Sequence, residues 1–133
     1  MLKIPRSIYT DMIDHSEQGA PLEICGILGG REGMVFETYR MTNTDQSNEH
    51  FMMDSREQFA VVRDLRSKGL EMSAIYHSHP ETPARPSEED IRLALTPGVS
   101  HVIISLATAE QPVARSYKIA DGSVEAEELI IIN

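Results

Sequence analysis

Cysteine, basic residues and long apolar runs are all scarce in this 133-residue sequence, and each scarcity excludes a class of protein. A single cysteine excludes an internal disulfide and any Cys-x-x-Cys zinc or redox site. No stretch approaches the ~18 apolar residues of a membrane span, and the first residues lack a signal peptide's apolar run, so we expect a cytoplasmic protein without a membrane partner. The 12 basic residues against 21 acidic ones give a formal net charge of −9, which argues against nucleic acid as a partner.

The sequence also lacks repeats, low-complexity tracts and linkers that would divide it. Its length suits one hydrophobic core, so we expect residues 1–133 to form a single domain. The excess of acids fits a protein partner with a basic face. The sequence leaves the oligomeric state open and is compatible with a homodimer.

Residues able to do chemistry concentrate between Tyr76 and Asp90. The apolar run before this stretch predicts a β-strand that ends with His77 and His79. Residues i and i+2 of a strand share one face and lie roughly 7 Å apart, which suits two imidazoles that bind one ion through Zn–N bonds of about 2.0–2.1 Å. Paired strand histidines are also common as surface groups, so this pair by itself leaves both interpretations open.

The segment after Pro80 is too rich in proline for regular structure, and Ser87 can begin a helix there. A serine followed three residues later by an acid is typical of a helix capping box, which Ser87 and Asp90 would form. A carboxylate in that first turn can also face back toward the histidine strand. The two interpretations are compatible, and the second supplies Asp90 as a third ligand. Ser78 points to the opposite strand face, so it can act only indirectly.

A buried strand is predicted from Glu23 to Gly30. Taken alone, Glu23 has the features of an ordinary carboxylate at a strand edge. Cys25 is predicted to be a small core residue, because nothing nearby would lower its thiol pKa. The glycines that follow lack the lysine of a phosphate-binding loop.

The remaining pattern predicts an α/β fold, with a mixed, largely antiparallel sheet and about three helices. The predicted helices are Pro5–Gly19, Arg56–Lys68 with Ser55 as its cap, and a third from Ser87 to about Thr96. The other predicted strands are Met34–Thr42, Val99–Leu106, Val113–Ile119 and Val124–Ile132. Residues 43–50 should form a flexible, substrate-facing loop. We expect His15 and His50 to be solvated, His101 to be packed or hydrogen-bonded, and Glu125, Glu127 and Glu128 to form a solvated face.

At this point the residues resemble a known family. The spacing His77-x-His79, seven residues, Ser87, two residues, Asp90 is that of the JAMM motif of JAB1/MPN/Mov34 metalloproteases. Residues 23–28, Glu-Ile-Cys-Gly-Ile-Leu, resemble the family segment that carries a catalytic glutamate, and residues 51–58 resemble the linker and helix of small prokaryotic members. The cysteine pair of a deaminase and the His-Glu-x-x-His signature of zincins are both absent from the sequence.

The resemblance implies the MPN/JAB1 fold, which is similar to the cytidine-deaminase arrangement, and one zinc ion per chain. His77, His79 and Asp90 would bind the metal and leave a fourth position for water. Glu23 would move the proton of that water during attack on a carbonyl carbon, and Ser87 would donate to the oxyanion.

Enzymes of this family hydrolyse amide bonds at the Gly-Gly terminus of ubiquitin-like proteins. The small bacterial members resemble the peptidase that releases cysteine from a ubiquitin-like sulfur carrier, a step of cysteine biosynthesis. We therefore expect a peptidase or isopeptidase with such a carrier as its partner. A non-catalytic MPN-type scaffold is the alternative, and a DNA-associated relative is disfavoured by the acidic charge.

Overall fold

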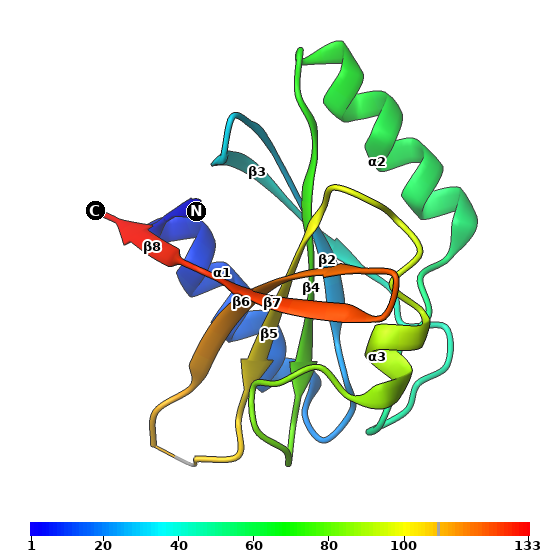
Figure 1. The fold of residues 1–133 in the computed structure, drawn as a ribbon, viewed down its shortest axis with the longest axis vertical. Helices are drawn as coiled ribbons and strands as arrows, with labels where there is room; N and C mark the ends of the chain where they lie inside the picture. Colours follow the sequence, from blue (N-terminus) through cyan, green and yellow to red (C-terminus); the bar gives the residue numbers. More distant parts are fainter. Residues whose placement is uncertain (109) are drawn as a thin grey trace.

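The computed structural model describes residues 1–108 and 110–133, and within them the chain forms three helices and one eight-stranded sheet (Figure 1). The helices are α1 (Arg6–Gly19), α2 (Ser55–Ser67) and α3 (Glu88–Arg92). The strands are β1 (Leu2–Pro5), β2 (Cys25–Arg31), β3 (Met34–Met41), β4 (Glu71–His79), β5 (Ser100–Ser105), β6 (Val113–Ala120), β7 (Ser123–Glu127) and β8 (Leu129–Ile132). No helix in these ranges is long and apolar enough to cross a membrane.

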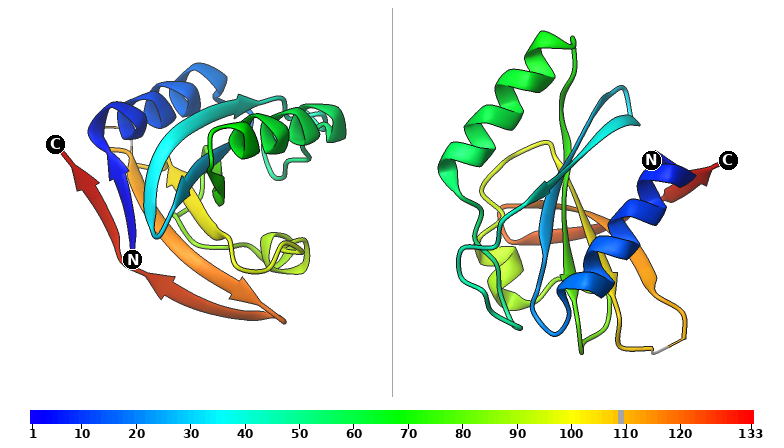
Figure 2. Two further views of the ribbon diagram at one scale, coloured as in Figure 1. Left: turned by 90° about the horizontal axis from the view of Figure 1, so that it is seen from above. Right: turned by 180° about the vertical axis from the view of Figure 1, so that it is seen from behind.

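The sheet has the strand order β7-β6-β5-β4-β2-β3-β1-β8 and is strongly curved (Figure 2). The neighbours β2 and β3, β2 and β4, β5 and β6, and β6 and β7 run antiparallel. The pairs β4 and β5, β1 and β3, and β1 and β8 run parallel. This arrangement confirms the predicted mixed, largely antiparallel sheet with three helices.

The helices cover opposite faces of the sheet. Helix α1 packs over a core cluster that includes Met12, Leu28 and Val102. Helix α2 covers a second cluster through Val61 and Leu65, and α3 lies beside a third. Strands β4 and β2 are in the middle of the strand order. Their two faces are covered by different helices and therefore have different environments.

Alternation along β4 sends neighbouring side chains to these two environments. Tyr76 faces α1 and is fully buried, whereas His77 faces the side covered by α2 and α3. Tyr76 lies directly across from Gly26, and a Cβ at Gly26 would come within 2.1 Å of the Tyr76 ring. The missing Cβ at Gly26 therefore leaves the space that the Tyr76 ring occupies. The Tyr76 hydroxyl is 2.7 Å from Nδ1 of His15.

Four details differ from the sequence prediction. Residues 2–5 form β1, a strand whose partners β3 and β8 come from distant parts of the chain. Asp54, not Ser55, caps α2, because its carboxylate accepts hydrogen bonds from Arg56 and Glu57. Helix α3 ends at Arg92, well before the expected end at about Thr96. The predicted last strand is divided into β7 and β8, which lie at opposite edges of the sheet.

The prediction that Glu127 belongs to a solvated acidic face is wrong. Its carboxylate accepts hydrogen bonds from the hydroxyls of Ser100 at 2.6 Å and Ser116 at 2.8 Å, and only 9% of its side chain is exposed. Glu125 and Glu128 are exposed, as predicted. Glu127 thus fixes β7 to strands β5 and β6 where the chain turns toward β8.

Candidate metal and catalytic site

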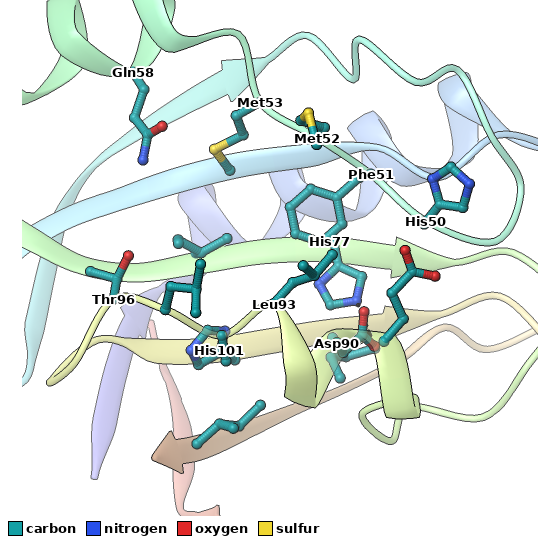
Figure 3. A pocket seen from close by; sticks show the side chains of 16 residues that line it. His50, Phe51, Met52, Met53, Gln58, His77, Asp90, Leu93, Thr96 and His101 are labelled. Atoms are coloured by element: carbon teal, nitrogen blue, oxygen red, sulfur yellow. Dashed lines mark hydrogen bonds and ion pairs between the residues drawn. The ribbon is translucent and has the colours of Figure 1, made fainter. Parts of the chain in front are cut away.

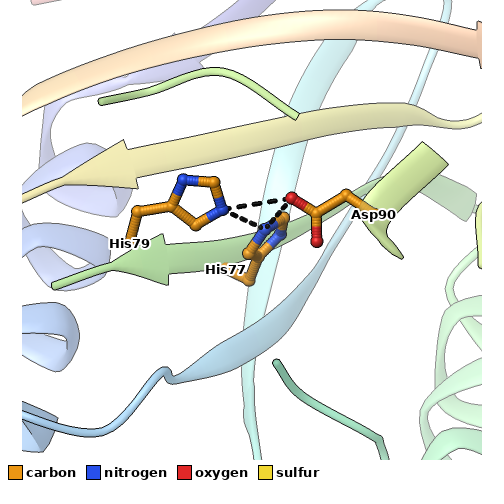
Figure 4. Close-up of side chains that lie close together, drawn as sticks. All are labelled: His77, His79 and Asp90. Atoms are coloured by element: carbon orange, nitrogen blue, oxygen red, sulfur yellow. Dashed lines mark hydrogen bonds and ion pairs between the residues drawn. The ribbon is translucent and has the colours of Figure 1, made fainter. Parts of the chain in front are cut away.

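Three donor atoms from two elements converge at the end of β4 (Figure 4). Nε2 of His77 lies 3.2 Å from Nε2 of His79, and Oδ2 of Asp90 lies 3.3 Å from the first nitrogen and 3.1 Å from the second. Both imidazoles are buried, and Asp90 reaches them from the first turn of α3. The structure thus brings together the three residues singled out as metal ligands.

The spacing of these atoms fits a tetrahedral metal. Ligands at about 2.0–2.1 Å from a tetrahedral zinc ion lie about 3.3–3.4 Å from one another. The three observed separations, 3.1 to 3.3 Å, are close to that edge length. Two nitrogens and one carboxylate oxygen are also donors that zinc accepts in proteins. The three side chains therefore form one face of a coordination tetrahedron.

Burial and hydrogen bonds together determine the protonation of the three side chains. Nδ1 of His79 lies 2.9 Å from the carbonyl oxygen of Pro83, which fixes the proton on Nδ1 and leaves the Nε2 lone pair facing the cluster. Burial lowers the pKa of His77, which favours its neutral form. At His79 burial also acts to lower the pKa, but the contacts with Asp90 and with the Pro83 carbonyl outweigh it and raise that pKa. Burial acts to raise the pKa of Asp90, but its contacts with the two imidazoles outweigh burial and hold that pKa well below its usual range. A metal cation binds two neutral rings and an ionised carboxylate, so it would displace the proton that Asp90 and Pro83 favour on His79.

Glu23 lies beside this cluster, two residues before β2 begins. Cys25 pairs with His77 across the antiparallel ladder, so the same register places Glu23 opposite His79. The side chain is buried, with 3% of the residue exposed, and no described residue bonds to Oε1. Burial raises the pKa of Glu23 to about 7, although nearby His79 partly opposes the shift. A buried carboxylate without a partner is costly, which is typical of a group kept for catalysis.

Ser87 makes both contacts of the capping box. Its hydroxyl oxygen accepts from the N–H of Asp90 at 3.0 Å, and its own N–H donates to Oδ2 of Asp90 at 2.9 Å. The capping and ligand interpretations of Asp90 are therefore compatible, because the same carboxylate oxygen faces both the helix start and the imidazoles. Ser87 is exposed at the rim of the site. As expected, Ser78 faces away and contacts the main chain of Ile24.

A cavity of about 310 Å³ extends from the cluster between α2 and α3 (Figure 3). Its wall before α2 is formed by Phe51, whose ring stacks on His77 with centroids 4.6 Å apart. The lining is mainly apolar and comprises His50, Phe51, Met52, Met53, Gln58, Ile75, His77, Glu89, Asp90, Leu93, Ala94, Leu95, Thr96, His101, Ile103 and Ile119. The candidate metal site thus opens into an apolar groove rather than into bulk solvent alone.

The other singled-out residues lie outside the cluster. His15 is not freely solvated as predicted, because it contacts Tyr76 and burial lowers its pKa to about 4. His50 is partly exposed and pairs with Asp45 at 2.9 Å. His101 is packed, as expected, and 8% exposed. Burial raises the pKa of Cys25 to about 12, in agreement with a core residue.

Sequence reasoning missed two residues of the site. The stacking of Phe51 on His77 is a contact between distant segments and leaves no local signal. Asn43 hydrogen-bonds to the main chain of Glu23 and of its own loop. The only signal for Asn43 was the sequence Asn-Thr-Asp, because asparagine often bonds to the N–H two residues on, as it does here with Asp45.

Comparison with known proteins agrees with this geometry. The family model for prokaryotic homologues of the JAB domain matches residues 5–120. The CysO-cysteine peptidase of Mycobacterium tuberculosis is 34% identical over 134 residues, which cover 99% of this chain and 92% of that protein. The desampylase of Haloferax volcanii is 29% identical over 111 residues, which cover 78% and 80% of the two chains.

A solved structure is also similar throughout. The solution structure of a Desulfitobacterium hafniense protein has a TM-score of 0.91 and 46% identity, and the match covers 99% of this chain and 93% of that one. The similarity therefore includes the sheet, the three helices and the segments that carry the site. The chain belongs to the family of prokaryotic JAB (JAB1/MPN, or JAMM) domain proteins.

Proposed function

We propose that this protein is a zinc-dependent peptidase that hydrolyses the amide bond at the Gly-Gly terminus of a ubiquitin-like sulfur carrier and releases cysteine. The observation that carries the proposal is the convergence of His77, His79 and Asp90 beside the unpartnered carboxylate of Glu23. A non-catalytic scaffold has no need to keep a buried acid without a partner next to three metal donors.

His77, His79 and Asp90 would hold the ion, one per chain. Zinc bound there supplies a water of lowered pKa and polarises the substrate carbonyl. Glu23 accepts the proton that the attacking water loses and gives it to the departing amine. Its pKa of about 7 suits both steps, because a group that must take and return a proton at neutral pH works best when its pKa is close to that pH.

Ser87 would stabilise the oxyanion that forms on the carbonyl oxygen. Its hydroxyl oxygen is held by the N–H of Asp90, which leaves the hydroxyl proton free to point toward a substrate at the rim. A positioned donor of this kind contributes about 3 kcal/mol to lowering the barrier. The capping bond therefore orients a group that would otherwise rotate.

The substrate class follows from the groove and the relatives. The apolar cavity between α2 and α3 can hold an extended chain end, and glycines at its tip would let the main chain approach the metal closely. The net charge of −9 suits a carrier with a basic face. Release of cysteine, rather than of a second protein, rests on the similarity to the CysO-cysteine peptidase.

Metal analysis combined with a Glu23→Gln variant tests the proposal. We expect about one zinc per chain in both proteins, because the three donors that form the site are unchanged. Cleavage of a carrier adduct that ends in Gly-Gly–cysteine should fall about 10²–10⁴-fold in the variant. Glu88→Gln, which changes an exposed acid at the start of α3, is the matched control and should keep full activity.

Two outcomes would overturn the proposal. Full activity of Glu23→Gln would remove the assigned proton carrier. Wild-type protein that binds no zinc after metal loading, and that binds a carrier without cleaving it, would make the chain a scaffold.

A further inference from the structure

We propose that Asn43 is a positioning residue that acts through Glu23, by holding the main chain that carries the proton-transferring carboxylate. The inference rests on the proposed function for its catalytic consequence. Its structural part concerns the loop of residues 43–53, which precedes α2 and forms one wall of the cavity. Residues 43–50 of that loop were expected from sequence to be flexible, yet the loop makes specific hydrogen bonds.

Glu23 needs support from outside the sheet. Strand β2 begins at Cys25, so the ladder does not hold the main chain of Glu23. Both of its main-chain polar groups are instead bonded to the loop. The N–H of Glu23 donates to the carbonyl of Ser47 at 2.8 Å, and its carbonyl accepts from Nδ2 of Asn43 at 3.0 Å. The loop therefore substitutes for the missing neighbouring strand.

The side chain of Asn43 uses its full hydrogen-bonding capacity. Nδ2 also donates to the carbonyl of His50 at 3.1 Å, and Oδ1 accepts from the N–H groups of Asp45 and Met52, each at 3.0 Å. A primary amide has two donor hydrogens and two acceptor lone pairs, and all four are used here. One side chain thus joins Glu23 to both ends of the loop.

These bonds connect the proton carrier with the metal ligands from two directions. On one side, the loop held by Asn43 carries Phe51, whose ring stacks on His77. On the other side, Ile24 donates to the hydroxyl of Ser78 at 2.9 Å, and its carbonyl accepts from the Ser78 N–H at 3.1 Å. Glu23 is therefore held between the cavity wall and the strand that carries both histidines. Asn43 is the side chain through which the loop reaches Glu23, beside the main-chain bond to Ser47.

The bonds also explain why an amide is required. Aspartate has the same shape and would keep the two acceptor contacts, with Asp45 and Met52. It would lose both donors and place a carboxylate oxygen against the carbonyls of Glu23 and His50, which repel it. Asn43→Asp therefore changes the hold on Glu23 with a minimal change of volume.

The first test measures cleavage by the zinc-loaded protein. We expect Asn43→Asp to lower kcat on the order of 10²-fold, the effect typical of a misplaced catalytic group, with about one zinc per chain retained. Asn48→Asp places the same charge on the same loop, at an exposed residue with no side-chain hydrogen bond among the described residues, and should change kcat less than about twofold. Asn43→Ser repeats the test without the new charge, in case the aspartate variant does not fold.

A double-mutant cycle separates positioning from general stability. If Asn43 acts through Glu23, adding Asn43→Asp to Glu23→Gln should lower the residual rate by less than about threefold, because the group it positions is already disabled. An equal loss in the wild-type and Glu23→Gln backgrounds would overturn the inference.

Amide hydrogen exchange tests the structural part without any substrate. The N–H of Glu23 should exchange about tenfold faster in Asn43→Asp than in Asn48→Asp, as expected when a partly buried hydrogen-bond network is weakened. If the wild type cleaves no carrier adduct, the proposed function fails while this measurement still decides whether Asn43 holds Glu23. Unchanged exchange at Glu23 would overturn the inference even if the protein is a peptidase.

Discussion

The two faces of strand β4 show how one segment serves packing on one side and chemistry on the other. On the α1 face, Tyr76 is fully buried and its hydroxyl contacts His15. On the face toward α2 and α3, His77 and His79 meet Asp90 beside a cavity. Both faces are made by neighbouring residues of the same strand, so the difference comes from what covers them.

The comparison teaches where this fold tolerates unsatisfied polar groups. Helix α1 packs directly over Tyr76, whereas on the other face the site lies between α2, the five-residue helix α3 and the loop before α2. Among the described residues, the α1 face has one buried side-chain atom without a partner, Oγ1 of Thr38, whereas Oε1 of Glu23, Nδ1 of His77 and Nε2 of His101 gather on the other face. Such groups reduce stability, and they are retained where a ligand is expected to use them. The following substitutions should therefore affect the two faces in different ways.

The largest expected effect is a loss of activity, on the face of β4 toward α2 and α3. Asp90→Ala removes one of three donors and should abolish zinc retention and reduce cleavage at least about 10³-fold, because the metal contributes several kcal/mol of charge stabilisation. Inductively coupled plasma mass spectrometry and a carrier-cleavage assay measure both. Glu88→Ala, in the same helix turn, should retain zinc. Zinc retained in full by Asp90→Ala would contradict the ligand assignment.

A smaller effect, on stability alone, is expected on the α1 face of β4. Gly26→Ala puts a Cβ against the Tyr76 ring and should lower the free energy of unfolding by about 1–3 kcal/mol, the usual cost of overpacking. Urea denaturation measures the loss, and adding Tyr76→Leu should restore part of it by removing the ring atoms that clash. The folded fraction should keep its zinc. A variant as stable as wild type would show that the two strands can separate there at no cost.

The smallest expected effect is a pH dependence of stability, caused by His15 on the α1 face. The pKa of His15 is lowered to about 4 by burial and by Arg40, so the folded state favours the neutral ring. Its stabilising contribution is complete above the unfolded pKa of about 6.5 and is lost as the pH falls toward 4. Because the ring is half-exposed, solvent screening limits the change to less than about 1 kcal/mol. Urea midpoints at pH 7 and pH 5 should differ less in His15→Gln than in wild type; equal differences would rule out the contribution.

The sequence was sufficient for the parts of the molecule that depend on local pattern or fixed spacing. The His-x-His pair and the Ser-x-x-Asp turn have spacings imposed by one strand and one helix turn, and the structure brings His77, His79 and Asp90 together. The apolar β-branched run of β5 and the stripe of α2 were equally clear.

Apart from the cap of α2 and the end of α3, the features that sequence reasoning missed depend mainly on contacts between distant segments. Strand β1 has four residues and is defined by β3 and β8, neither of which is near it in sequence. In the sequence Glu127 is indistinguishable from its exposed acidic neighbours, because the hydrogen bonds that it accepts come from Ser100 and Ser116, which are distant in sequence. Asn43 lies in a polar loop that looks unstructured, because its side-chain bonds leave no periodic pattern.

The most direct measurement is a crystal structure of the zinc-loaded protein with anomalous data at the zinc edge. We expect one zinc peak per chain, about 2.0–2.2 Å from Nε2 of His77, Nε2 of His79 and a carboxylate oxygen of Asp90, with a fourth position that a water occupies on the side of Glu23. A peak elsewhere, or a protein atom in the fourth position, would contradict the account.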